Sequence, residues 1–410
     1  MQPENTSAIN TGSSLHETPR PVCVIAGRED CLVRIAMVQG QADPERDGVA
    51  DYVRHLTAAL RDLGEEVLPV PVLGPREAAE RLHALKPDLA HVQFAPSAFG
   101  FSARPGLLPD RVHGLRFVTT LHEYGWWASP RWVPGAVWRP LERARLWDRE
   151  TWRFVPRSSA VLTTNAGHSR VLQERFGRTA VQVPLAPNVP DLWVGGDVPD
   201  RVEARRRLGV PAEAQVVAFF GFVHPVKGLR YLIEALARLR GAGRDRLHLL
   251  ILGGFTSVAL PEHEARAFRE ELIAWTRTCG VARHVTITGR LPAKEVSAAL
   301  HGADLAAFPF TAGATTKSGA LLSAFAHGLP TLVTAANPAD PDLVDGSSVV
   351  VAPRVRDALV LVEGVARLLD DEPLRRKVAA GGSALMAGRS WEEIAATHRA
   401  IYSEVLRDQE

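Results

Sequence analysis

The feature of this chain that most constrains its fold is a regular alternation between short apolar runs and longer stretches with helical spacing. Each apolar run ends at a glycine or polar turn, and the stretch that follows repeats apolar residues three and four positions apart. Strands and helices that alternate in this way imply right-handed crossovers and a parallel sheet that is buried on both faces. The pattern therefore predicts an α/β protein.

The alternation occurs in both halves of the chain. Predicted strands in the first half are residues 34–38, 67–70, 89–94, 117–121, 160–164 and 181–184. Those in the second half are residues 216–220, 247–252, 285–288, 305–308, 331–334 and 349–351. Predicted helices at the C-terminus are residues 355–369, 373–386 and 391–406. Because each half has enough strands for its own sheet, the sequence predicts two Rossmann-like domains.

The length of 410 residues also favours two domains, because a single hydrophobic core seldom serves a chain of that size. We expect a partly disordered leader at residues 1–33 and an N-terminal domain at 34–190. Residues 187–200 are rich in Pro, Gly and Asp, and a linker is expected at 191–205. The C-terminal domain is expected at 206–388, and a final helix at 389–410 is expected to return to the N-terminal domain.

Composition excludes several classes of protein. The net charge of +2 is too balanced for a nucleic-acid-binding protein. Cys23, Cys31 and Cys279 show no metal-ligand spacing, so we expect no metal site and no disulfide framework. No apolar stretch is long enough to span a bilayer, and residues 1–21 lack the pattern of a signal peptide. These features predict a cytoplasmic protein.

Two loops that follow predicted strands could bind an anion. In the first, residues 221–228, Lys227 stands at the start of a helix, where free amides and the helix dipole already favour negative charge. The second loop begins at Pro309 and leads into a helix at residues 318–326. It gathers hydroxyls, a cation and helix-start amides at Thr315, Thr316, Lys317 and Ser318. A solvated turn lysine and ordinary helix caps are the plainer explanations of these residues.

Both loops, their spacing and the ending at residues 390–402 resemble the retaining glycosyltransferases of family 4, which have the GT-B fold. The resemblance runs from about Arg34 to Leu406, nearly the whole chain. Matching motifs occur in the order Asp47–Tyr52, His122–Glu123, Lys227–Gly228, Gly289–Pro292, Ala303–Asp304 and Ala326–Pro330. The resemblance implies two domains that face a central cleft. It also implies a nucleotide-sugar donor as substrate, no cofactor and no bound metal.

The resemblance further implies roles for individual residues. Lys227 would contact the donor diphosphate, and His122 would face the transferred sugar or the acceptor; these two are the expected catalytic residues. The expected donor site consists of Gly221, Lys227, Gly289, Thr315, Thr316, Lys317, Ser318, Gly319 and Ser323. The expected acceptor site consists of Gly48, Gln93, His122 and Glu123, with Gly40 at its border.

The chain departs from the family at two places. Family members usually have two glutamates eight positions apart around the donor helix, where this chain has Thr315 and Ser323. A hydroxyl keeps one hydrogen bond at each place but loses the charge-assisted part. Relatives also often have an arginine at the position of Phe222. We therefore hypothesise that Lys317 supplies the second positive charge on the diphosphate.

Six of the nine tryptophans lie between Trp126 and Trp152, interleaved with arginines. Such a segment suits a peripheral membrane contact or an anionic or lipid-linked acceptor. The alternative, which we favour, is that most of these tryptophans pack the core of the first domain. Residues 141–154 are predicted to be helical.

The sequence therefore predicts a metal-independent glycosyltransferase of the retaining, hexosyltransferase type. Its expected partners are a nucleotide-sugar donor and a glycan, lipid-linked or small-molecule acceptor. The main alternative is a glycosyltransferase-like protein that has lost turnover and serves as a binding or partner subunit, and a phosphorylase is a third.

Overall fold

The computed structural model of the chain describes residues 32–40, 47–72, 74–194, 196–198, 200–255 and 260–407. Residues 1–31, which contain Cys23, Cys31 and nearly all of the predicted leader, lie outside the described residues. Gly195 and Pro199 of the predicted linker do so as well. None of the helices in the described ranges is long and apolar enough to cross a membrane.

The N-terminal sheet has six parallel strands in the spatial order β2-β1-β3-β4-β5-β6. Their bounds are β1 Arg34–Gln39, β2 Glu66–Pro71, β3 Leu89–Phe94, β4 Arg116–Leu121, β5 Ser158–Thr163 and β6 Val181–Gln182. The helices of this part are α1 Gly48–Asp62, α2 Pro75–Leu85, α3 Gly135–Arg143, α4 Phe154–Arg157 and α5 Ala166–Phe176, with a 3-10 turn at Arg104–Leu107. The central strand β3 is buried along its whole length, as expected for a sheet covered on both faces.

The C-terminal sheet repeats this plan with the strand order β12-β11-β10-β7-β8-β9, again parallel throughout. Its strands are β7 Gln215–Phe220, β8 Leu247–Leu252, β9 Val285–Ile287, β10 Leu305–Phe308, β11 Thr331–Thr334 and β12 Val350–Ala352. The helices are α6 Arg201–Arg207, α7 Leu229–Gly241, α8 Glu262–Thr278, α9 Ala293–His301, α10 Gly319–Ala326, α11 Ala358–Asp370 and α12 Glu372–Ala384. Two 3-10 turns lie at Pro225–Lys227 and Ala282–His284. The predicted α/β class with two Rossmann-like domains is confirmed.

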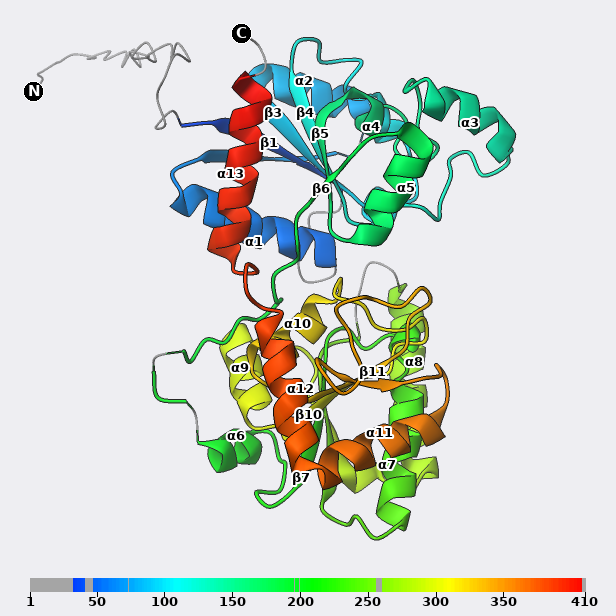
Figure 1. Cartoon of the computed structure of the whole chain (residues 1–410), viewed down its shortest axis with the longest axis vertical. Coiled ribbons are helices and arrows are strands. Elements are labelled where there is room, and N and C mark those ends of the chain that lie inside the picture. The colour runs from blue at the N-terminus through cyan, green and yellow to red at the C-terminus, as the bar shows by residue number, and fades with distance from the viewer. Residues whose placement is uncertain are drawn as a thin grey trace, which may run out of the picture. The chain divides into compact units, whose positions relative to one another are not determined.

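The last helix, α13 Trp391–Arg407, packs against elements of the N-terminal sheet. Figure 1 shows this helix beside α1. Its buried residues Ile394, Ile401 and Tyr402 share one apolar cluster with Leu56 of α1 and Ile35 of β1. The C-terminus of the chain thus covers one face of the first sheet.

The structure differs from the sequence-based expectations in two segments. The predicted helix at residues 141–154 is wrong: α3 ends at Arg143, and Arg145 and Trp152 have positive φ angles of 57° and 53°, which a helix does not allow. Residues 201–205 of the predicted linker are helical, because Asp200 caps α6 and Arg205 forms an ion pair with Asp304 at 2.8 Å. The domain boundaries themselves stay a prediction.

Gly228 is a glycine that the close packing of two loops of the C-terminal sheet requires. Its φ is +71°, and a Cβ there would lie 1.9 Å from the carbonyl oxygen of Pro309. We expect Gly228→Ala to lower the free energy of unfolding by about 2 kcal/mol or more, because the backbone must move. Chemical denaturation measures this. Gly241→Ala at the end of the same helix is the control, since its Cβ would meet nothing within 4 Å; an equal loss in both variants would contradict the prediction.

Candidate active site

The reversal of strand order places the two anion-binding loops side by side. In the C-terminal sheet, β7 pairs with both β10 and β8, so the chain changes direction between β7 and β10. Ligands of open parallel sheets bind at such a switch point, beyond the carboxyl ends of the strands. The loop after β7 contains Lys227, and the loop after β10 leads into α10. The N–H of Thr311 donates to the carbonyl of Val226 at 2.9 Å and joins the two loops.

Lys227 is a half-buried amine at this junction. Its Nζ lies 4.0 Å from the ring centroid of Phe310, in cation–π contact. Burial lowers the pKa of Lys227 to about 8. Within the described part of the chain, no carboxylate pairs with this amine. The side chain is therefore a cation without a counter-charge of its own, at the position where the sequence predicts a diphosphate.

The start of α10 is partly occupied by a carboxylate of the chain itself. Asp340 Oδ2 accepts hydrogen bonds from the Thr316 amide at 2.8 Å and from the Thr316 hydroxyl at 2.9 Å. Ser318 caps the helix, since its hydroxyl accepts from the Leu321 amide, and the Thr315 carbonyl accepts from the Ser318 amide. The structure thus brings together Thr315, Thr316 and Ser318 as expected, but Thr316 already has an anionic partner.

Lys317 points toward the N-terminal domain. Its Nζ donates to Nε2 of His168 at 2.9 Å. Burial lowers the pKa of Lys317, and the nearby carboxylates Glu123 and Asp340 oppose that shift. Burial, followed by the charge of Lys317, lowers the pKa of His168 to about 3, so the imidazole is a neutral acceptor. The predicted donor residue Lys317 and the predicted acceptor residue Glu123 therefore lie in one electrostatic cluster.

Sequence reasoning did not identify His168. It belongs to the first turn of α5, where Asn165 caps the helix by accepting from the His168 amide at 3.1 Å. The available signal was a histidine just after a strand and a cap, on the side of the sheet where ligands bind.

His122 and Gln93 form a second group in the N-terminal domain. His122 Nε2 lies 2.7 Å from Oε1 of Gln93, a geometry in which the imidazole N–H donates to the amide oxygen. Burial lowers the pKa of His122 to about 3, with His168 and His398 acting in the same direction, so His122 is neutral. Burial raises the pKa of the adjacent Glu123 carboxyl, and Asp47 raises it as well. Gln93 itself is fully buried, which leaves it a positioning rather than a contacting side chain.

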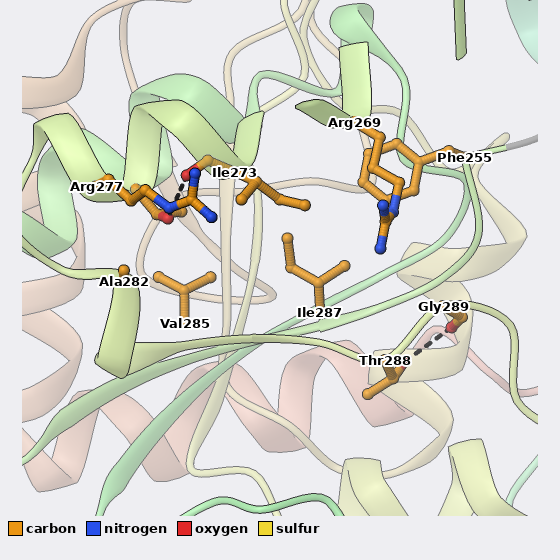
Figure 2. Close-up of a pocket in the computed structure, with 10 residues that line it drawn as sticks. Phe255, Arg269, Ile273, Arg277, Ala282, Val285, Ile287, Thr288 and Gly289 are labelled. Carbon is orange, nitrogen blue, oxygen red and sulfur yellow. Dashed lines mark hydrogen bonds between the residues drawn. The ribbon is translucent and has the colours of Figure 1, made fainter. Parts of the chain in front are cut away.

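The neighbouring strands β7, β8 and β9 are followed, within two residues, by Gly221, Gly253 and Gly289. A Cβ on Gly253 would lie 1.9 Å from the Gly221 carbonyl oxygen, and Gly253 forms an isolated bridge with Gly289. Gly289 also borders a cavity of about 400 Å³. Figure 2 shows this cavity between α8 and β9, with Arg269 and Arg277 beside the apolar side chains of Ile273 and Ile287. Gly253 therefore links Gly289 to the loop that begins at Gly221. The cavity itself lies at the edge of the sheet, beside β9.

The Ser323 side chain is fully buried, and its hydroxyl already has two hydrogen-bond partners. It donates to the Gly319 carbonyl at 2.8 Å and accepts from the Val189 amide at 3.0 Å. Gly319 in turn accepts from the Asn188 amide at 3.0 Å, and a Cβ on Gly319 would collide with the Asn188 side chain. Gly319 and Ser323 thus attach α10 to the segment at residues 188–189, and the donor contact expected of Ser323 has no geometric support.

Gly48 is the first residue of α1, where Asp47 caps the helix by accepting from the Val49 amide at 3.1 Å. A Cβ on Gly48 would meet nothing within 4 Å, whereas one on Gly40 would lie 2.1 Å from the Ala98 carbonyl oxygen. Close packing therefore requires glycine at position 40 but not at position 48.

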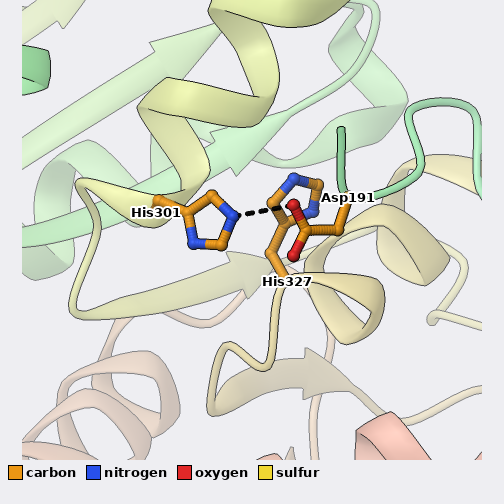
Figure 3. Close-up of side chains that lie close together, drawn as sticks. All are labelled: Asp191, His301 and His327. Atoms are coloured by element: carbon orange, nitrogen blue, oxygen red, sulfur yellow. Dashed lines mark hydrogen bonds and ion pairs between the residues drawn. The ribbon is translucent and has the colours of Figure 1, made fainter. Parts of the chain in front are cut away.

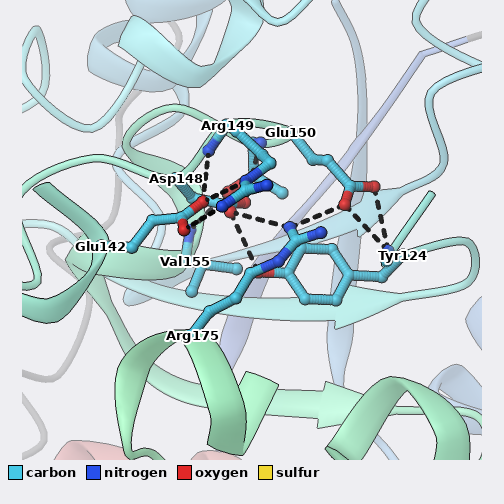
Figure 4. Close-up of polar contacts among 9 residues, drawn as sticks. Tyr124, Glu142, Asp148, Arg149, Glu150, Val155 and Arg175 are labelled. Carbon is cyan, nitrogen blue, oxygen red and sulfur yellow. Dashed lines mark hydrogen bonds and ion pairs between the residues drawn. The ribbon is translucent and has the colours of Figure 1, made fainter. Parts of the chain in front are cut away.

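Part of the tryptophan- and arginine-rich segment contacts the backbone that follows Glu123 of the predicted acceptor site. Arg175 of α5 pairs with Glu150 at 2.7 Å and with Asp148 at 3.4 Å, and the Tyr124 hydroxyl donates to Asp148 at 3.0 Å. Figure 4 shows this cluster, in which the Gly125 amide also donates to Glu150. Because Tyr124 follows Glu123 directly, the ion pairs fix the backbone beside the predicted acceptor site. Trp127 and Trp138 are buried, as the favoured interpretation expects, while Trp126 and Trp132 are exposed.

The C-terminal part of the chain is similar to a known protein family. Residues 200–384 match the family described as Glycosyl transferases group 1. This match covers less than half of the chain. The matched segment contains every predicted donor residue. Lys227 and Lys317 lie in the loops that follow β7 and β10, where the sheet changes direction.

Curated relatives extend the match into the first domain. The chain is 26% identical over 260 residues to a D-inositol 3-phosphate glycosyltransferase of Stackebrandtia nassauensis, which covers 62% of this chain and 56% of the relative. It is 27% identical over 379 residues to the protein of that name from Jonesia denitrificans, which covers 87% and 81%. For three of the first four relatives, the chain spans only about half of their length.

Solved structures establish the architecture. The crystal structure of Anabaena Alr3699/HepE in complex with UDP matches 90% of this chain and 100% of its own, with a TM-score of 0.68 at 17% identity. A glycosyltransferase from Rickettsia africae matches 92% and 100% with a TM-score of 0.70 at 14% identity. At this identity the likeness concerns the fold, which is GT-B.

The position of Ser323 gives a prediction that separates packing from donor binding. Ser323→Ala should lower the free energy of unfolding by about 1–3 kcal/mol, because the buried Val189 amide loses its acceptor. Nucleoside diphosphate affinity, measured by calorimetry, should change less than about twofold. Ser403→Ala is the matched control. The Ser403 hydroxyl also donates to the carbonyl one helical turn back, that of Arg399 at 3.0 Å, but it accepts from no backbone amide among the described contacts. A large loss of affinity without loss of stability would instead assign Ser323 to the donor site.

Proposed function

We propose that this chain is a retaining, metal-independent glycosyltransferase that moves a hexosyl group from a nucleotide-sugar donor to an acceptor hydroxyl. The observation that supports the proposal most is the half-buried Lys227 at the switch point of a group 1 glycosyl transferase domain. A cation there neutralises charge on the departing diphosphate, and stabilisation of developing charge commonly contributes more to such catalysis than any other single effect.

The proposed mechanism assigns the donor to the C-terminal domain and the acceptor to the N-terminal domain. Lys227 binds the diphosphate from the β7 side and Lys317 from the start of α10. His122 faces the sugar as a neutral imidazole, since its pKa of about 3 keeps it uncharged near neutral pH. The leaving phosphate takes the proton of the acceptor hydroxyl on the same face of the sugar, so the transfer needs no metal and no cofactor.

The donor and acceptor classes are also part of the proposal. UDP is the first nucleotide to test, because the Anabaena neighbour was solved with UDP. A phosphorylated cyclitol is the first acceptor to test, given the name that the curated relatives share. We place the activity in carbohydrate biosynthesis in the cytoplasm, with a contact at the membrane surface through the exposed Trp126 and Trp132.

The deciding experiment is thermal unfolding of the protein against a panel of nucleoside diphosphates. One nucleotide should stabilise the wild type, by about 2.7 kcal/mol at a hundredfold excess over its dissociation constant, and should fail to stabilise Lys227→Ala. Lys377→Ala, which removes an exposed lysine of α12, should behave like the wild type. No stabilisation by any nucleotide would favour the alternative, a binding or partner subunit without turnover.

The pH dependence of nucleotide binding tests whether the positive charge of Lys227 is needed. Lys227 is protonated below its pKa of about 8 and neutral above it, so the dissociation constant should rise by up to about tenfold per pH unit above 8. Lys227→Arg keeps its charge throughout this range, so its profile should be flat. A wild-type profile that stays flat to a pH of about 9.5, well above that pKa, would contradict the assignment of Lys227 to the phosphates.

Lys317 should contribute to turnover rather than to folding. Lys317→Ala is expected to reduce kcat by tens to hundreds of fold, because one of two cations on the leaving group is lost. The measurement is initial rate at saturating donor, with Lys377→Ala as the control and Lys317→Arg as a variant that restores part of the rate. An unchanged kcat in Lys317→Ala would show that the residue only joins the two domains through His168.

A further inference from the structure

Three metal-ligating side chains meet at the end of α10 that lies opposite Ser318. They are Asp191 of the segment between the two sheets, His301 at the end of α9 and His327 at the C-cap of α10. Their ligand atoms all lie within 4.8 Å of one another. Figure 3 shows the carboxylate of Asp191 beside the imidazole ring of His327 and bonded to that of His301. Nothing in the proposed transfer reaction uses these residues.

His327 is already oriented as a metal ligand would be. Its Nδ1 lies 2.7 Å from the Ser323 carbonyl, which can only accept, so Nδ1 has the proton and Nε2 has the lone pair. Ligating histidines usually donate their other N–H to a carbonyl in this way. The Nε2 lone pair currently accepts a hydrogen bond from the Ser297 hydroxyl at 2.7 Å. A cation would therefore compete with only one neutral hydroxyl for this nitrogen.

Asp191 and His301 complete the set. His301 Nε2 lies 2.9 Å from Asp191 Oδ1, and that oxygen also accepts from the Trp193 amide at 3.0 Å. Both contacts at Oδ1 come from nitrogen atoms, as expected for a carboxylate that accepts, and Oδ2 remains for a cation. His301 would give up its Nε2 proton on binding the cation.

The backbone around the cluster also favours positive charge. Helices α9 and α10 both end here, at His301 and at Ala326, and the C-terminus of a helix has negative partial charge. Two such ends converge on one point together with a carboxylate. The two imidazole rings pack edge to face with centroids 5.0 Å apart, which fixes their separation.

We propose that Asp191, His301 and His327 bind one divalent transition-metal ion of the zinc type. Two imidazoles and a carboxylate suit Zn²⁺ and Co²⁺, whereas Mg²⁺ and Ca²⁺ prefer sites made of oxygen alone. Zinc lies about 2.0–2.2 Å from such ligands, so ligand atoms in a tetrahedral site are about 3.3 Å apart. Ligand atoms within 4.8 Å of one another need to approach by at most about 1.5 Å, and a water molecule completes the coordination.

The ion would have a structural role. It would join the segment that leaves the first sheet to the ends of α9 and α10, and so hold α10 at its end far from Lys317. The site is separate from the proposed transfer, which remains independent of metal. It was not expected from the sequence, because the two histidines belong to different helices and Asp191 lies far from both along the chain.

The test is titration of chelator-treated, full-length protein with Zn²⁺ by calorimetry and with Co²⁺ by visible absorption. We expect one ion per chain in the wild type and in His263→Ala, which removes an exposed histidine of α8. Asp191→Asn and His301→Ala should each weaken the affinity by at least about tenfold. Zn²⁺ at a hundredfold excess over its dissociation constant should raise the melting temperature of the wild type by about 5 °C or more.

Ser297→Ala sharpens the test, because it should act in the opposite direction. Removing the hydroxyl frees the Nε2 lone pair of His327, so Zn²⁺ should bind more tightly than in the wild type. Tighter binding in this variant together with weaker binding in the ligand variants would support the site, even if His301→Ala proved unstable. Equal Zn²⁺ affinity in the wild type, Asp191→Asn and Ser297→Ala, or no binding at all, would overturn it.

Discussion

The close approach of two loops at the switch point of the C-terminal sheet is the constraint on which the candidate site depends. The chain between β7 and α7 passes so near the end of β10 that residue 228 has no room for a side chain against Pro309. The same approach places the amine of Lys227 on the ring of Phe310 and removes much of its solvent. A cation that is half-buried by backbone packing, and not by an ion pair, keeps its charge available for a ligand.

A second constraint comes from the segment between the two sheets, which attaches to α10 along its whole length. Asn188 binds the backbone at Gly319, Val189 donates to Ser323 one turn later, and Asp191 meets His327 at the far end. Asn188 also donates to Asp51 of α1 at 3.1 Å. Movement of α10 is therefore coupled to this segment and, through Asn188, to the start of the first helix of the N-terminal domain.

The sequence predicted most of the fold because its strands are continuous apolar runs. Residues 89–94, 247–252, 305–308 and 331–334 were predicted with the bounds that the structure has. The prediction failed at residues 141–154, where helical spacing was present but Arg145 and Trp152 adopt left-handed backbone geometry that no local pattern reveals. Tertiary packing overrides propensity in such a segment.

The candidate site was less predictable than the fold, because local sequence patterns do not show which distant segments lie close together. Lys227 and Thr315 could be singled out because each lies in a loop that follows a strand. The residues that these loops contact could not be predicted, because they are distant in the sequence. Asp340 accepts from the Thr316 amide across 24 residues, and His168 accepts from Lys317 across 149 residues. The surroundings of Ser323 could not be predicted for the same reason, since only the fold shows that the Val189 amide donates to its hydroxyl.

The charges around α10 can replace part of what the two glutamates of family 4 would supply. The resemblance to that family leads one to expect these glutamates at positions 315 and 323. A carboxylate does reach the start of this helix, but it comes from Asp340 and binds the Thr316 amide. Together with Glu123 it opposes the lowering of the Lys317 pKa that burial causes. Burial also lowers the pKa of Lys227, to about 8, and no such carboxylate opposes it among the described residues. A diphosphate at Lys227 would therefore supply a counter-charge that this amine lacks, whereas at Lys317 it would share the amine with Glu123 and Asp340.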